Sequence, residues 1–178
     1  MGRIIAVYGL IAAVIVVLGW NIGMLFLPEG GTAGIIVGYL SMLVATSFVF
    51  VGVKRYRDTE LGGVIRFWPA LWTGLGIAAV ASIAYVLSWE VFMWKTDYSF
   101  MAQYTASTLK ELNASGASAA ELAKQASELQ AFAKDYENPG FRMMITLSEF
   151  APIGLFVPLV SAALLRKSSF MPAKSAQN

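Results

Sequence analysis

Four long apolar runs dominate this sequence and leave it few ways to fold. They cover about residues 4–26, 34–53, 68–94 and 141–167. A helix needs about 20 apolar residues to cross roughly 30 Å of hydrocarbon, and each run is long enough. A backbone in lipid must also satisfy its own hydrogen bonds, which favours helices. The sequence therefore predicts an all-α integral membrane protein with four transmembrane helices.

The first apolar run has an alternative interpretation as a secretory signal peptide. Such a peptide has an apolar stretch of about 7–15 residues, followed by a cleavage site of small residues. The run here is longer, and no A-x-A pattern follows it. We therefore expect it to be retained as a span.

Composition removes most kinds of reactive chemistry. The chain has no cysteine and no histidine, so it lacks thiolate ligands and the commonest general base. Its net charge of +2 is too small to indicate nucleic-acid binding, and no phosphate-binding glycine motif follows a strand-like run. The sequence therefore predicts a protein that is not an enzyme, has no catalytic residues, and carries no cofactor or metal.

Basic residues are concentrated in short segments that would lie on one side of a membrane. Eight of the 13 Lys and Arg residues lie there. They are Arg3, Lys54, Arg55, Arg57, Arg66, Arg166, Lys167 and Lys174. Short loops rich in Lys and Arg stay in the cytoplasm. We therefore expect cytoplasmic termini, a cytoplasmic loop at 54–67 and a cytoplasmic tail at 168–178, with residues 97–140 outside.

Two glycine pairs suggest where spans touch. Gly19 and Gly23 lie late in the first run, and Gly34 and Gly38 lie early in the second. Small residues four apart let two membrane helices approach closely. The pairs either bring these two spans together, serve a homodimer, or reflect only the high frequency of glycine in membrane helices.

The segment from 97 to 140 changes to Ala, Ser, Glu, Lys and Gln and predicts a helical hairpin. Ser118 and Glu121 have the spacing of a capping box. Leu122, Leu129 and Tyr136 recur at helical spacing before the stop at 138–140. Either the two arms pack on each other and on the membrane surface, or one face binds a periplasmic partner or lipid.

The charged residues between the second and third runs allow three interpretations. They are Lys54, Arg55, Arg57, Asp58, Glu60 and Arg66. The loop is either a solvated determinant of topology or a site for anionic lipid headgroups or a cytoplasmic partner. A cation held by the two carboxylates is opposed by the flanking positive charges. Gly62 and Gly63 should allow a tight turn toward the third span.

An acid within the fourth run is the most unusual feature of the chain. Glu149 lies about one turn inside the hydrocarbon boundary, and Asn21 and Glu90 should lie at a similar depth. Charges within spans are usually paired and face the interior. We expect an intramembrane polar cluster of Asn21, Glu90 and Glu149, with Lys95 or Arg142 as the counter-charge. The cluster is either a structural pin between spans or a pocket for a cation, a proton or a headgroup.

Two segments resemble a known bacterial family. They are the K-R-Y-R-D-x-E-x-G-G run from Lys54 to Gly63 and the N-P-x-F-R…E-x-x-P-x-G run from Asn138 to Gly154. With the hairpin between them, they resemble the membrane proteins of domain-of-unknown-function family 4199. The resemblance implies a small four-span protein of the bacterial inner membrane and implies no activity or cofactor.

These observations leave two hypotheses for function. The first is a non-catalytic accessory, scaffold or assembly subunit of a larger membrane complex, in contact with the lipid bilayer and a membrane-protein partner. The alternative is a small transporter, or a carrier linked to protons or cations, that uses Glu149 and Glu90. Because four spans are few for a conduction path, the second hypothesis requires a homo-oligomer.

Overall fold

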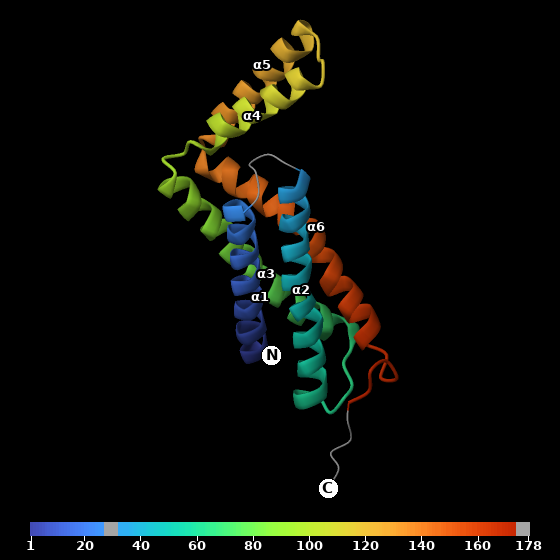
Figure 1. The fold of residues 1–178 in the computed structure, drawn as a ribbon. Helices are drawn as coiled ribbons and strands as arrows, with labels where there is room; N and C mark the ends of the chain where they lie inside the picture. Colours follow the sequence, from blue (N-terminus) through green and yellow to red (C-terminus); the bar gives the residue numbers. More distant parts are fainter. Residues whose placement is uncertain (27–31, 174–178) are drawn as a thin grey trace.

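A computed structural model of the chain is all helical and confirms the predicted fold class (Figure 1). It describes residues 1–26 and 32–173, and the side chains of residues 24–35 are not described. The helices are α1 (Gly2–Phe26), α2 (Thr32–Glu60), α3 (Phe67–Lys95), α4 (Phe100–Ala114), α5 (Ala119–Tyr136) and α6 (Pro139–Leu165). No strand occurs within the described ranges.

Four of these helices, α1, α2, α3 and α6, are long and apolar enough to cross a membrane. Helices α2 and α3 occupy the middle of the bundle, because each contacts the other and also α1 and α6. Small and branched side chains fill the space between them. Those that are fully buried include Ala12, Val16, Ala45, Val49, Val53, Ile77 and Ala81. Small core residues let the helices pack closely, as membrane bundles require.

Among the glycines whose surroundings the structure describes, Gly19 and Gly23 of α1 pack against α2. A Cβ added to Gly19 would overlap Ser41 of α2, and one added to Gly23 would lie 3.6 Å from Val37. No described atom lies within 4 Å of a Cβ on Gly38, so the expected contact on α2 is made by Ser41 instead. The surroundings of Gly34, the turn at 27–31 and Lys174 lie outside the described residues.

The expected cytoplasmic loop at 54–67 is mostly helix, which corrects the predicted boundary. Helix α2 continues through Glu60, so only residues 61–66 connect it to α3. The turn is made by Gly62 and Gly63, whose φ angles are 64° and 90°, and the Gly63 N–H donates to the Arg57 carbonyl at 2.9 Å. A charged end extends the helix beyond the apolar run because charged side chains form helix readily in water.

Helices α4 and α5 form the expected hairpin, which projects from the end of the bundle opposite the N-terminus (Figure 1). Both bonds of the capping box between Ser118 and Glu121 are present at the start of α5. Asn138 caps α6, with Pro139 in its first turn. At about 1.5 Å per residue, the arms are about 22 and 27 Å long.

Candidate functional site

Arg142 lies at the point where the hairpin meets the bundle. Its side chain is only 2% exposed, although it lies in the first turn of α6. Its Nε donates to Glu90 Oε1 at 2.8 Å, and a terminal nitrogen donates to Glu90 Oε2 at 2.5 Å. The other terminal nitrogen donates to the Tyr136 carbonyl at 3.1 Å. One guanidinium therefore connects α3, the end of α5 and α6 by a two-bond ion pair, the strong form of such a contact.

Aromatic rings enclose this ion pair. The Arg142 guanidinium lies 5.2 Å from the centre of the Tyr98 ring and 5.9 Å from that of Tyr136, within the range of cation–π attraction. The Tyr136 hydroxyl accepts a bond from Trp89 Nε1 at 2.8 Å. Burial raises the pKa of Tyr136. We call Trp89, Glu90, Tyr98, Tyr136 and Arg142 the hairpin junction.

Further rings extend the hairpin junction toward α1 and α4. Trp89 packs against Trp20 at 5.6 Å between ring centres and against Phe100 at 4.9 Å. Trp20 Nε1 donates to Ser88 Oγ at 2.9 Å. Helices α1, α3 and α4 each contribute a ring, so the base of the hairpin is held to the bundle from several sides.

Glu149 is separate from this junction and has a different partner. Its Oε2 accepts a hydrogen bond from the Tyr85 hydroxyl at 3.0 Å, and Tyr85 is only 7% exposed. Glu149 itself is exposed on the surface of the bundle. Within the described part of the chain, Tyr85 is the one group that donates to this carboxylate.

Helix geometry places Glu149 and Arg142 at different depths. Measured from Leu165 at 1.5 Å per residue, Glu149 lies about 24 Å along α6 and Arg142 about 35 Å. With roughly 30 Å of hydrocarbon, Glu149 falls inside it and Arg142 falls just beyond it. The buried guanidinium pairs with Glu90 rather than with Glu149.

The expected polar cluster is thus divided, and two of its members lie apart. Asn21 is exposed, and its side-chain amide donates to the Val17 carbonyl of its own helix at 2.7 Å. Lys95 is also exposed and forms no ion pair with a described residue. Neither residue binds Glu149, and of the two expected counter-charges it is Arg142 that pairs with an acid of the cluster, Glu90.

Arg57 forms a second buried site at the opposite end of the bundle. Its side chain is 0% exposed, and its Nε donates to Asp58 Oδ1 at 2.7 Å. Its terminal nitrogens donate to the carbonyls of Phe170 at 2.9 Å, of Leu165 at 3.5 Å, and of Met171. Arg57 therefore holds the segment after α6 against α2, which differs from the solvated side chain expected for a topology determinant.

The other charged residues at this end divide into paired and unpaired groups. Asp58 also binds Lys54, and Glu60 accepts from the terminal amino group of Met1 at 2.9 Å. Arg55 and Arg66 are exposed and form no ion pair with a described residue. No group of three or more His, Cys, Asp or Glu side chains that could hold a metal occurs in the described ranges, so Asp58 and Glu60 have no third carboxylate beside them.

Sequence reasoning missed the aromatic hydroxyls and the backbone carbonyls as partners. The sequence predicts Tyr136 only as part of an apolar stripe. It predicts no hydrogen-bonding role for Tyr85 and no contact between Tyr98 and a charged residue. A signal for Tyr85 exists, since a tyrosine in an apolar run has a hydroxyl that seeks a partner at its own depth. No pattern in the sequence points to the carbonyls that Arg57 binds.

Comparison with known families places the chain. Residues 7–167 match the family described as protein of unknown function, DUF4199. The chain belongs to this family. No curated protein and no solved structure matches it.

The region that matches the DUF4199 family contains most of the residues described above. It includes the hairpin junction, the Tyr85–Glu149 pair and Arg57, and it extends from α1 through the end of α6. Arg3 precedes it, and Phe170 and Met171, whose carbonyls Arg57 binds, follow it.

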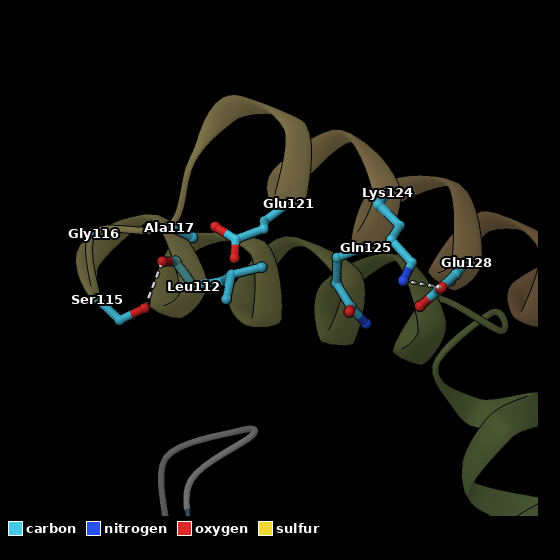
Figure 2. Close-up of a pocket in the computed structure, with 8 residues that line it drawn as sticks. All are labelled: Leu112, Ser115, Gly116, Ala117, Glu121, Lys124, Gln125 and Glu128. Atoms are coloured by element: carbon cyan, nitrogen blue, oxygen red, sulfur yellow. Dashed lines mark hydrogen bonds and ion pairs between the residues drawn. The ribbon is translucent and has the colours of Figure 1, made fainter.

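The hairpin tip of this DUF4199 protein carries an open hollow of about 510 Å³ (Figure 2). Its charged side chains already have partners. Lys124 lies 3.9 Å from Glu128, and Glu121 is held in the capping box, where the Ser118 backbone N–H lowers its pKa. The Ser115 hydroxyl donates to the Leu112 carbonyl. The hollow therefore offers a ligand no unpaired charge and is not a candidate site.

Proposed function

We propose that this DUF4199 protein is a non-catalytic accessory or scaffold subunit of a larger complex in the bacterial inner membrane, with both termini in the cytoplasm. The observation that supports this proposal is the exposed position of Glu149 within a span. A partner helix that brings a donor or a cation to this face completes the hydrogen bonding of the carboxylate.

The cost of leaving Glu149 in lipid supports a partner. Burying an unpaired charge in an apolar medium costs several kcal/mol, and the group takes up a proton instead where it can. The single bond from Tyr85 meets a small part of the hydrogen-bonding capacity of a carboxylate, which has about four acceptor positions. A contact with a second membrane protein lowers this cost without any catalytic role.

The attachment of the hairpin fits the same function. The ion pair and the surrounding rings of the hairpin junction hold the base of α4 and α5 to the spans. A helical pair anchored in this way keeps its direction relative to the bundle. We propose that it extends the binding surface outside the membrane.

Photo-cross-linking tests the proposed partner face. Phe156 lies seven residues after Glu149 on the same face of α6 and is 67% exposed. We expect p-benzoylphenylalanine at Phe156 to form one defined adduct with another membrane protein in living cells. A second substitution, Glu149→Leu, should abolish that adduct while the protein remains folded.

A matched position on another helix controls for random collisions. Leu18 is 55% exposed and lies on α1, which packs chiefly against α2 and α3. The same cross-linker at Leu18 should give no defined adduct. An adduct with a second copy of the chain alone, or none at Phe156, would contradict the accessory role.

A carrier linked to protons or cations is the second candidate function. The hydroxyl–carboxylate pair of Tyr85 and Glu149 inside a span favours it. The core offers it less support. Thr46 and Thr73 are buried, and each donates its proton to a carbonyl of its own helix rather than to a neighbouring helix.

A further inference from the structure

Two arginines border a hollow where the first turns of α1 meet the last turns of α2. The hollow has a volume of about 350 Å³, similar to the smaller sites that hold organic ligands. It lies at the end of the bundle that carries the N-terminus (Figure 1). The residues around it are Arg3, Ile4, Val7, Tyr8, Arg55, Thr59 and Glu60.

The charge of this hollow is positive and largely unused. Neither Arg3 nor Arg55 forms an ion pair with any residue in the described ranges. The lining therefore contains two arginines and one carboxylate, Glu60, which already accepts from the terminal amino group at 2.9 Å. Guanidinium groups present paired N–H donors whose geometry matches phosphate oxygens.

The wall below the charges is apolar. Ile4, Val7 and Tyr8 belong to the first two turns of α1, and Val7 is exposed. The candidate span of α1 begins at Gly2, and the apolar run of α2 ends at Val53, just before Arg55. The hollow therefore lies where charged groups meet hydrocarbon. Its charged part would match the headgroup of a phospholipid, and its apolar part would match the acyl chains.

We propose that this hollow binds the phosphate headgroup of an anionic phospholipid. Arg3 and Arg55 donate to the phosphate oxygens from two different helices, and Val7 contacts the glycerol and the start of an acyl chain. Free phosphate satisfies the arginines but leaves the apolar wall uncovered. Arg57 takes no part, because its donors already bind Asp58 and the carbonyls after α6.

Lipid binding to the delipidated full-length protein tests the proposal. Native mass spectrometry would follow titration with short-chain phosphatidylglycerol, with phosphatidylcholine as the neutral comparison. The double variant Arg3→Gln/Arg55→Gln should weaken phosphatidylglycerol binding by about tenfold or more, since it removes charge-assisted hydrogen bonds. The double variant Arg166→Gln/Lys167→Gln removes the same charge outside the hollow and should leave binding unchanged.

A second variant separates the hollow from charge alone. Val7→Trp fills it without changing charge and should also weaken binding of phosphatidylglycerol. Equal weakening by the two double variants, or full binding by Val7→Trp, would overturn the site. Competition by millimolar inorganic phosphate as effective as that by the lipid would show a free-phosphate site and overturn the lipid assignment.

Discussion

Two buried arginines perform similar structural work at opposite ends of the bundle. Arg142 binds Glu90 and one carbonyl, and Arg57 binds Asp58 and three carbonyls. The sequence predicts Arg142 as a counter-charge for an acid, whereas the charge pattern assigns Arg57 only to topology or to a binding surface. A guanidinium suits this work because its five donors can serve several acceptors at once.

Replacing Arg57 should test its role in holding the segment after α6. Arg57→Ala leaves Asp58 with Lys54 as its one remaining ion-pair partner among the described residues and frees carbonyls at Phe170 and Met171. We expect it to lower the free energy of unfolding in detergent by about 3 kcal/mol or more, as removal of one member of a buried pair does. The exposed neighbour provides the control, since Arg55→Ala should change thermal stability little. Equal effects would mean that the buried bonds of Arg57 contribute nothing.

A double-mutant cycle should show which acid is coupled to Arg142. The geometry pairs it with Glu90 through two bonds, and Glu149 binds Tyr85 instead. We expect Arg142→Ala and Glu90→Gln to be non-additive by about 1 to 3 kcal/mol in thermal or chemical unfolding. Arg142→Ala and Glu149→Gln should be close to additive. Strong coupling in the second cycle would return Glu149 to a cluster with Arg142.

At the scale of helices and turns, local signals predicted well and charge patterns predicted poorly. The capping box at Ser118 and the glycine turn at 62–63 depend on neighbouring residues, so the sequence carries them directly. The charged segment predicts a loop from residue 54, whereas α2 continues to Glu60. Lys54 and Asp58 form an ion pair four residues apart, a spacing that stabilises a helix.

The turn between α3 and α4 depends on two residues in an unfavourable backbone region. Asp97 and Tyr98 have φ angles of 48° and 57°, where residues with a side chain are uncommon. This conformation places the Tyr98 ring beside Arg142. Asp97→Gly should therefore maintain or raise the melting temperature, whereas Tyr98→Gly should lower it because the ring is lost. A rise with both variants would show that the ring contributes less than the backbone strain costs.

For the whole molecule, composition predicted the four spans and the hairpin, but the sites needed the structure. Long apolar runs predict membrane-spanning helices because the thickness of the bilayer sets the number of apolar residues that a span needs. The grouping of Asn21 with Glu149 failed because depth along a helix does not say in which direction a side chain points. The hollow beside Arg3 and Arg55 also requires that two distant helix ends meet, which no local pattern shows.

The direction of the chain in the membrane is a property of the whole molecule and is open to direct test. Basic residues in short loops predict that the hairpin faces outward and that the segment after α6 faces the cytoplasm. The chain has no cysteine, so single cysteines report without background. Ser115 at the hairpin tip and Ser168 after α6 are both exposed, which makes them a matched pair.

In intact cells, an impermeant maleimide should label Ser115→Cys and should leave Ser168→Cys unlabelled. After lysis both should react, because both side chains are exposed in the folded protein. The lysed sample also controls for reactivity, since a cysteine that fails there says nothing about sidedness. The opposite pattern, with Ser168→Cys labelled first, would invert the orientation. It would place the arginine-lined hollow on the outer face, and the lipid met by Arg3 and Arg55 would then belong to the other leaflet.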